Sequence, residues 1–254
     1  MSDLTGKIAL VTGGGTGIGE AAALALAAAG VKVVITGRRK ARLDEVVVLV
    51  EAGGGTALAI PGDASEEADA VAAVEQCVAH FGRIDILVNS AGVNEAGGVE
   101  ALSLDMWRKV IDINLMGTIY TCHAAFPHMK AGGGGDIINI SSTSGRRSAA
   151  AFASYSTSKF GVTGFTEALR QEGGAHNIRV AIVEPGATET EIAASISDPK
   201  WSAAIQQHVT KDGAMKASDI ADAIMFILTL PRRANVSQIL IRPTIDTAPC
   251  NPES

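Results

Sequence analysis

The sequence predicts one α/β domain, built on a doubly wound parallel sheet of about seven strands with helices on both faces. Two observations lead to this fold class. Apolar runs of strand length alternate with longer stretches of helical periodicity along the chain. No linker of low complexity divides the 254 residues, and 47% of them are hydrophobic, which is enough to enclose one large core. We therefore expect residues 1–254 to fold as a single unit.

The expected elements follow in chain order. Strands are predicted at residues 7–12, 31–36, 57–61, 84–88, 137–140, 178–183 and 239–241. Helices are predicted at residues 20–29, 66–81, 106–129, 152–173 and 217–230. The glycine runs Gly53–Gly55 and Gly132–Gly135 lie where short connections from helix to strand are needed. Right-handed crossovers between successive strands then give a parallel sheet that is covered on both faces.

A glycine-rich turn follows the first strand. Residues 13–19 read Gly-Gly-Gly-Thr-Gly-Ile-Gly, and an alanine-rich helical stretch comes next. Glycines let the backbone approach a pyrophosphate closely, and a helix N-terminus offers free N–H groups and a positive dipole end. The turn has one residue more between its first two glycines than the G-x-G-x-x-G fingerprint, so a flexible loop is the alternative. Its position between a strand and a helix favours a dinucleotide site.

Basic residues follow the second strand. Arg38, Arg39 and Lys40 occur together, and residues 31–43 contain no carboxylate. An acidic residue at this point would accept hydrogen bonds from the ribose of NAD, whereas arginine accommodates the additional phosphate of NADP. The charges therefore predict NADP rather than NAD, with Arg38 as the best candidate for a bidentate grip on the phosphate and Arg39 beside it. The alternative is a solvated cationic turn.

A tyrosine and a lysine lie four residues apart in a predicted helix. Tyr155 and Lys159 share one helix face at this spacing, and the pair Ser141–Ser142 lies upstream. An ammonium beside a phenol favours the phenolate, which lowers the phenol pKa from its usual value of about 10. Such a tyrosine can exchange a proton with an alcohol or carbonyl oxygen. Taken alone, the spacing also occurs by chance as a solvated contact.

Composition argues against several other classes of protein. The net charge of −6 argues against general nucleic-acid binding. No apolar run is long enough to span a membrane, and residues 1–6 lead directly into the first strand, so no signal peptide is expected. Cys77, Cys122 and Cys250 lack metal-like spacing and are expected to be reduced thiols in the cytoplasm. The five histidines form no ligand pair, so no metal site is expected.

Taken together, the motifs resemble the short-chain dehydrogenase/reductase family over nearly the whole chain. The resemblance rests on Thr12–Gly13, Gly17–Gly19, Asn89–Gly92, Asn114, Ser142, Tyr155, Lys159 and Pro185–Gly186, in that order. It implies a Rossmann-type domain, a nicotinamide cofactor, and hydride transfer between the cofactor and an alcohol or carbonyl carbon. Residues 1–135 would form the cofactor half, and residues 136–254 the catalytic and substrate half.

The resemblance implies four catalytic residues. Tyr155 is similar to the family's general acid/base, and Lys159 to the group that lowers the tyrosine pKa and holds the nicotinamide ribose. The family's serine precedes the tyrosine by thirteen residues, which selects Ser142, whose hydroxyl would bond the substrate oxygen. Asn114 matches the asparagine that bends a helix and helps to hold a water near the lysine.

Cofactor contacts are implied in the same way. The pyrophosphate region would meet Gly13, Thr16, Gly17, Ile18 and Gly19. The adenine would meet Asp63 and Ala64, and Asn89 would lie near the adenine ribose. Ala91 and Gly92 are also expected to contact the cofactor. The nicotinamide and a phosphate would meet Pro185, Gly186, Thr188 and Thr190, together with Tyr155 and Lys159. Asp63 has a second, compatible interpretation as a cap of the next helix.

The chain departs from the family pattern in two places. Ser90 stands where the family usually has a second asparagine, which affects local strand stabilisation rather than catalysis. The segment 238–244 leads into a tail with Pro249, Cys250 and Pro252 instead of a glycine-rich ending. This ending is similar to that of a branch of NADP-dependent reductases that act on small hydroxy acids, aldehydes or ketones.

The substrate pocket is expected to form from three segments, residues 93–98, 145–152 and 189–207. Arg146 and Arg147 indicate either an anionic substrate or a solvated basic pair on a loop. Trp201 would either close over the substrate or pack a lid helix against the body. The chemical class expected is a small alcohol, ketone or aldehyde.

Two other functions use the same fold. A dehydratase or epimerase would usually need a second base or carboxylate near Tyr155, and the sequence indicates none. A cofactor-binding sensor without turnover would be favoured by loss of Tyr155 or Lys159, and both are present. The family usually assembles through its long helices, so we expect a homodimer or homotetramer that uses residues 110–125 and 160–169.

Overall fold

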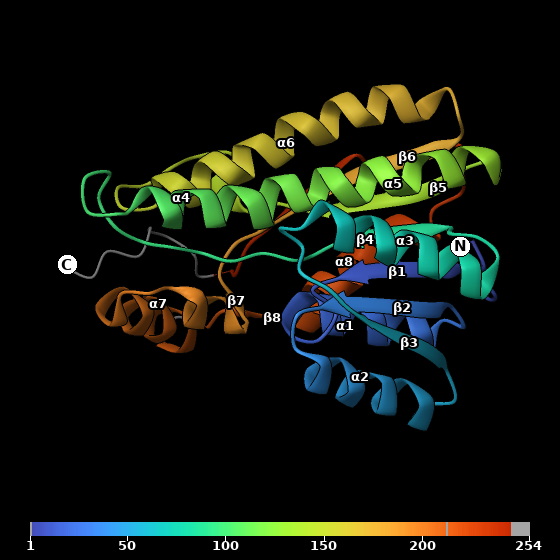
Figure 1. The fold of residues 1–254 in the computed structure, drawn as a ribbon, viewed down its shortest axis with the longest axis horizontal. Coiled ribbons are helices and arrows are strands. Elements are labelled where there is room, and N and C mark those ends of the chain that lie inside the picture. The colour runs from blue at the N-terminus through green and yellow to red at the C-terminus, as the bar shows by residue number, and fades with distance from the viewer. Residues whose placement is uncertain (1, 212, 245–254) are drawn as a thin grey trace.

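Seven parallel strands form one sheet in the order β3-β2-β1-β4-β5-β6-β9 (Figure 1). The computed structural model describes residues 2–211 and 213–244. The strands are β1 Ile8–Thr12, β2 Lys32–Gly37, β3 Thr56–Pro61, β4 Ile86–Asn89, β5 Gly135–Ile140, β6 Ile178–Pro185 and β9 Gln238–Ile241. The predicted fold class and its seven strands are confirmed.

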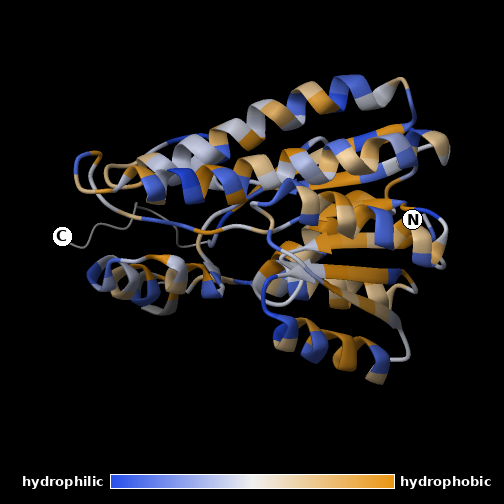
Figure 2. Ribbon diagram, in the orientation of Figure 1, coloured by the Kyte–Doolittle hydropathy of each residue, from blue (hydrophilic) through white to orange (hydrophobic). Residues whose placement is uncertain are grey.

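Helices cover both faces of the sheet (Figure 1). One layer consists of α1 Gly17–Ala28, α2 Lys40–Ala52 and α8 Ala217–Thr229, and the other of α3 Glu67–Phe81, α5 Gly117–Ala131 and α6 Ala153–Gly174. Successive residues of β1 point to opposite faces, so Ala9 and Val11 enter one core while Ile8 and Leu10 enter the other. Figure 2 shows the apolar residues concentrated in the strands between the two helix layers.

Three features of the helices and strands differ from the expectation. The helix predicted at 106–129 is α4 Leu104–Ile111, a π-helical segment Asp112–Met116, and then α5. The helices α2 and α7 Pro199–Lys211 were not among the predicted ones. A second sheet pairs β7 Thr188–Glu189 with β8 Met215–Lys216. Strands of two residues carry no periodic signal, so only the tertiary approach of the two segments reveals them.

Loops that follow six of the strands, β1 to β6, meet at one edge of the sheet. The strand order reverses between β1 and β4, which are neighbours although their connections run to opposite sides. Ligands of open α/β sheets bind in the crevice at this reversal, outside the carboxyl ends of the strands. The tail residues Pro249, Cys250 and Pro252 lie outside the described part of the chain. Within that part, no helix has the length and apolar character needed to cross a membrane.

Candidate active site

The glycine turn packs tightly against the loop after β4. Gly13 has φ +65°, and a Cβ there would lie 2.9 Å from the backbone of Ala91. The Thr12 hydroxyl accepts hydrogen bonds from the backbone N–H groups of Ser90 and Ala91, both at 3.1 Å. A Cβ at Gly19 would lie 2.2 Å from the carbonyl oxygen of Gly13, so α1 begins directly against the turn. The backbone is thus open where a pyrophosphate would lie beside the start of α1.

Two adjoining cavities follow the carboxyl edge of the sheet. The smaller, of about 150 Å³, lies beside Arg38, Asp63 and Ala64, and the larger, of about 660 Å³, lies beside Ser142 and Tyr155. Both are lined by Gly13, Thr16, Arg38, Arg39, Ala91, Gly92 and Val93. They therefore form one extended cleft that runs from the end of β2 to the start of α6.

Most of the residues expected to bind the cofactor line this cleft. They are Gly13, Thr16, Gly17, Ile18, Arg38, Arg39, Asp63, Ala64, Ala91, Gly92, Tyr155, Lys159, Pro185, Gly186, Thr188 and Thr190. Gly19 and Asn89 do not line it. Gly19 acts through the close packing of α1, which any side chain would prevent.

Asn89 faces the protein interior instead of the cleft. Its Nδ2 donates to Asn139 Oδ1 at 2.9 Å, and its Oδ1 accepts from the Thr121 hydroxyl at 2.6 Å. Asn139 in turn donates to Thr166 on α6 at 3.0 Å. The side-chain amide is therefore bonded inside the protein, and the expected position of Asn89 near the adenine ribose stays a prediction. The register of β4 directs the Asn89 side chain towards α5, where buried amide groups need partners.

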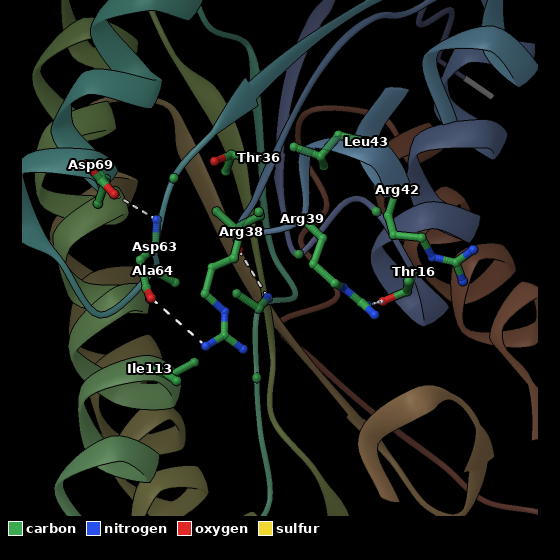
Figure 3. A pocket seen from close by; sticks show the side chains of 18 of the residues that line it. Thr16, Thr36, Arg38, Arg39, Arg42, Leu43, Asp63, Ala64, Asp69 and Ile113 are labelled. Carbon is green, nitrogen blue, oxygen red and sulfur yellow. Dashed lines mark hydrogen bonds and ion pairs between the residues drawn. The ribbon is translucent and has the colours of Figure 1, made fainter. Parts of the chain in front are cut away.

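The two arginines after β2 point in opposite directions. Arg38 extends towards Asp63, with 4.0 Å between its Nη1 and the Asp63 Oδ2, whereas Arg39 extends towards Thr16 (Figure 3). Arg39 also donates to the carboxylate of Glu191 at 2.7 Å. Of the two, Arg38 has fewer of its guanidinium N–H groups engaged by other side chains.

Asp63 holds the turn before α3 but does not cap this helix, because the N-cap residue is Glu66. The Asp63 Oδ1 accepts hydrogen bonds from the backbone N–H and the hydroxyl of Ser65, at 3.0 and 2.8 Å, just before α3. Its other oxygen faces Arg38, and the residue lines the smaller cavity. The carboxylate thus fixes the turn after β3 and borders the cleft.

Tyr155, Lys159 and Ser142 meet at the wall of the larger cavity. Tyr155 and Lys159 lie one turn apart on α6, and the lysine Nζ is 5.7 Å from the centre of the tyrosine ring. The same Nζ donates to the carbonyl oxygen of Ile140 at 2.9 Å. Ser141 is bonded to the Lys159 carbonyl oxygen at 3.0 Å, so it fastens β5 to α6. Ser142 is the serine beside the tyrosine, in agreement with the thirteen-residue spacing.

Burial dominates the ionisation of this pair. It raises the pKa of Tyr155 to about 12, while the Ser142 hydroxyl acts in the opposite direction. It lowers the pKa of Lys159 to about 8, because the buried ammonium loses hydration. The tyrosine pKa is therefore raised, not lowered as expected. Desolvation has the larger effect, because the Lys159 ammonium is bonded to the Ile140 carbonyl and not to the phenol oxygen.

We expect Lys159→Met to be more stable than the wild type at pH 7, by roughly 2 kcal/mol in the free energy of unfolding. The wild type must bury an ammonium whose pKa falls from about 10.4 in the unfolded chain to about 8. Between these two pH values the unfolded chain binds more protons, so the lysine contribution to stability rises with pH. The advantage of the variant should therefore shrink from pH 8 to pH 10.

Urea unfolding of both proteins across this pH range measures the effect. The difference between them is the informative quantity, because the buried thiols Cys77 and Cys122 have raised pKa values and reduce stability over the same range in both proteins. A difference that stays constant from pH 8 to pH 10 would show that the lysine pKa is not lowered.

Asn114 lies in the π-helical segment between α4 and α5. Its Oδ1 accepts from the backbone N–H of Val93 at 2.8 Å, and its Nδ2 donates to the Val93 carbonyl at 2.9 Å and to Ser158 at 3.0 Å. A Cβ placed on Gly92 would be 3.5 Å from the asparagine Oδ1 and 3.7 Å from the Lys159 Nζ. The asparagine therefore fixes the loop after β4 beside the lysine. π-helical segments are frequent at functional sites, and this one interrupts the predicted helix at Asn114.

All three segments expected to form the substrate pocket reach the larger cavity. Val93 and Asn94 contribute from the first segment, but residues 95–98 do not. The others contribute Arg147, Ser148, Ala149, Phe152, Thr190, Glu191, Ile192, Ala194, Ser195 and Ile205. Trp201 packs edge-on against Phe152, with 5.5 Å between the ring centres, and does not line the cavity. It therefore holds α7 against the body of the protein.

The adjacent arginines Arg146 and Arg147 have different environments. Arg146 donates to the fully buried carboxylate of Glu184 at 2.7 Å, and Gln238 donates to the same oxygen at 2.9 Å. The side chain of Arg147 lines the larger cavity and has no ion-pair partner among the described residues. Arg147 is therefore the one of the pair that an anionic substrate would meet.

Several charged residues near the cleft were missed by the sequence reasoning. Arg42 lines the smaller cavity, and Glu191 lines the larger one. Glu95 is almost fully buried and pairs with Lys109 at 2.8 Å. Arg42 pairs both with Glu45, three residues away, and with the distant Glu191. The Glu191 and Lys109 pairs join positions 149 and 14 residues apart, so no local spacing indicates them.

Comparison with known proteins extends these observations. A family model described as short chain dehydrogenase matches residues 7–201. An uncharacterized oxidoreductase of Staphylococcus aureus (strain N315) is 36% identical over 247 residues, which cover 96% of this chain and 100% of that protein.

Solved structures show the same relationship. A metagenomic short-chain oxidoreductase in complex with NADP is 32% identical with a TM-score of 0.82, over 96% of this chain and 100% of that chain. A short chain dehydrogenase from Burkholderia cenocepacia in complex with NADP is 33% identical with a TM-score of 0.83, over 95% and 98%. With family matches that extend from the glycine turn beyond the tyrosine and lysine, the chain belongs to the short-chain dehydrogenase family of oxidoreductases.

Proposed function

We propose that this protein is an oxidoreductase that transfers a hydride between NADP(H) and the carbon of a small alcohol, ketone or aldehyde. One observation carries the proposal. Tyr155, Ser142 and Lys159 line the same cavity as the glycine turn that begins at Gly13. A proton donor, a hydrogen-bonding hydroxyl and a buried cation thus border the space next to a dinucleotide-type turn, as redox chemistry at a carbon–oxygen bond requires.

The cleft has the features that NADP needs. The open backbone at Gly13 and the free N–H groups at the start of α1 suit the pyrophosphate. Arg38, at the end of β2, supplies the positive charge for the 2′-phosphate. The NADP complexes of two relatives with about one-third identity support the same cofactor. When bound, NADP supplies or accepts the hydride.

The residues of the chain would then handle the proton and orient the oxygen. Tyr155 donates its hydroxyl proton to the carbonyl oxygen during reduction and takes a proton from the alcohol during oxidation. The Ser142 hydroxyl donates a hydrogen bond to the same oxygen and supports its developing charge. Lys159 holds its ammonium beside Tyr155, and Asn114 fixes the adjoining loop at Val93, which bounds the substrate space.

The residues around the larger cavity favour redox chemistry over a dehydratase or epimerase. Among the described residues that line this cavity, Glu191 is the carboxylate, and it is bonded to two arginines. Glu184 is fully buried behind Arg146. Neither is placed as a second base beside Tyr155. The presence of Tyr155 and Lys159 likewise argues against a sensor without turnover.

Absorbance of NADPH at 340 nm with a panel of small ketones and aldehydes tests the proposed activity. We expect oxidation of NADPH with at least one of them and much slower oxidation of NADH. Product formation with unchanged nicotinamide would support an isomerase-type reaction instead. Binding of NADPH without turnover of any alcohol or carbonyl compound would support the sensor.

We also propose that the protein assembles as a homodimer or homotetramer through α4, α5 and α6. Leu104 on α4 and Phe160 on α6 are large apolar side chains that are 69% and 46% exposed. Their burial against a second copy would be favourable. Light scattering is expected to give two or four times the chain mass of 26.0 kDa. The mass of a single chain would contradict the assembly.

We infer a cytoplasmic location from the two cysteine thiols that the structure describes. Cys77 and Cys122 are free and buried, and the raised pKa of each keeps it as an unreactive thiol. Proteins with free cysteines and no disulfide are typical of a reducing compartment.

A further inference from the structure

A short segment crosses the mouth of the cleft and is fastened on both sides. Residues 187–197, which we call the strap, contain β7 and the 3₁₀ helix Glu191–Ser195. The strap lies at the carboxyl edge of the sheet, next to α7 (Figure 1). It lines the larger cavity together with Thr16 and Ile18. A dinucleotide that reaches from Arg38 to Tyr155 would therefore run beneath it.

One fastening joins the strap to the loop after β4. The Ser195 hydroxyl accepts from the backbone N–H of Asn94 at 2.8 Å. Its single proton points between two carbonyl oxygens, that of Ile192 at 2.7 Å and that of Asn94 at 3.1 Å. The buried Glu95 accepts from the backbone N–H and the hydroxyl of Ser197, at 2.8 and 2.9 Å, and its charge is paired with Lys109. This end of the strap is held by buried groups, so it is the firmer of the two.

The other fastening is an ion-pair cluster that we call the clasp, formed by Glu191, Arg39 and Arg42. One carboxylate oxygen of Glu191 accepts from Arg39 at 2.7 Å, and the other accepts from Arg42 at 2.8 Å. The hydrogen bond from Arg39 is the main reason why the pKa of Glu191 lies below its usual value. These contacts join positions about 150 residues apart. They connect the strap to the start of α2.

The clasp lies next to the glycine turn at residues 13–19. Arg39 also reaches the Thr16 hydroxyl at 3.4 Å, and a Cβ on Gly17 would lie 3.2 Å from the side chain of Thr190. The strap is thus pressed against the first residues of α1, where the pyrophosphate would bind. The side chains of the clasp are 41 to 58% exposed, so solvent weakens each pair and the clasp can open.

We propose that Arg39, Arg42 and Glu191 are positioning residues that close the strap over the cofactor, and that Arg38 alone recognises the 2′-phosphate. Arg39 already directs its guanidinium to Glu191 and away from the side where Arg38 and Asp63 lie (Figure 3). The clasp acts at the pyrophosphate, which NADP and NAD share. It therefore retains both cofactors equally and does not discriminate between them. This inference rests on the proposed cofactor site.

Dissociation constants of NADPH and NADH, measured by fluorescence on the intact protein, test the clasp. Glu191→Gln is expected to raise both constants by about fivefold, the effect of losing roughly 1 kcal/mol of ion pairing. Arg39→Met should raise them by the same factor, and the double variant should add little more, because both substitutions open the same contact. The matched control is Glu189→Gln, an exposed carboxylate two residues away, which should leave both constants unchanged.

Hydrogen exchange of the strap tests the clasp without any cofactor. Amides of residues 188–196 are expected to exchange several times faster in Glu191→Gln than in the wild type and in Glu189→Gln. This measurement separates the clasp from the proposed function, because it does not depend on binding or turnover.

Unchanged exchange with unchanged dissociation constants would overturn the proposal. Selective weakening of NADPH by Arg39→Met would also overturn it, since Arg39 would then be a phosphate ligand. Tighter binding of the cofactors by Glu191→Gln would overturn the proposal as well, since the carboxylate would then compete with the cofactor.

Discussion

Tyr155→Phe is expected to lower kcat by about a thousandfold while the dissociation constant of NADPH changes by less than about threefold. The substitution removes a phenol hydroxyl in the larger cavity, on a ring whose centre lies 5.7 Å from the Lys159 Nζ. The ring remains, so the packing of α6 is kept. Stopped-flow and steady-state rates with the best ketone of the panel, together with NADPH titration, measure the two effects.

The chain offers a matched control for this prediction. It contains two tyrosines, and the other, Tyr120, lies on α5 and does not line either cavity. Tyr120→Phe removes the same oxygen atom and should retain the wild-type rate within about twofold. A Tyr155→Phe variant that keeps more than about one-tenth of the wild-type rate would refute the acid/base role. A fall in both variants would point to a general loss of folding, which their melting temperatures would reveal.

Arg38→Asp is expected to reverse the cofactor preference, with a change of about a hundredfold or more in the ratio of kcat/KM for NADPH and NADH. The substitution replaces a cation at the end of β2 by a carboxylate, which repels the 2′-phosphate and accepts hydrogen bonds from the ribose of NAD. Arg38 is well placed for this effect because, among the described residues, it pairs only with Asp63, at a long distance of 4.0 Å.

Lys40→Asp provides the comparison for Arg38→Asp. It makes the same change of charge two residues later, but Lys40 is exposed at the start of α2, pairs with Asp44 and lines neither cavity. If a positive charge in this region acts only through the long-range electrostatic field of the protein, both variants will change the ratio of kcat/KM for NADPH and NADH equally. If Arg38 contacts the phosphate, Lys40→Asp will change the ratio by only a few-fold. An unchanged ratio in Arg38→Asp would disprove the phosphate role.

The sequence predicted the parts of the site whose geometry is local. Tyr155 and Lys159 share a face because helix geometry alone brings residues four apart together. The glycine turn lies between β1 and α1 because a strand, a run of glycines and a helix are adjacent in the chain. The seven strands were found because each is apolar over several residues. In these cases neighbours in sequence are also neighbours in space.

The remaining features depend on contacts between distant segments. The β4 register turns Asn89 inwards to Asn139, although its place after an apolar run suggested the cleft. The buried carboxylate of Glu184 pairs with Arg146 and leaves Arg147 to line the cavity. No residue close to these arginines in the sequence indicates this pairing. The strap bonds to arginines at the start of α2 and to the loop after β4. Spacing along the chain holds no information about such partners.

What the sequence by itself determined is the sheet, the glycine turn and the helical face that carries the phenol and the ammonium. Only the tertiary structure decided which arginine is free for a phosphate, which polar groups are buried, and how far burial moves each pKa. The physical reason is that backbone geometry acts over one or two turns of chain. Desolvation and ion pairing, in contrast, depend on the side chains that other segments bring into contact.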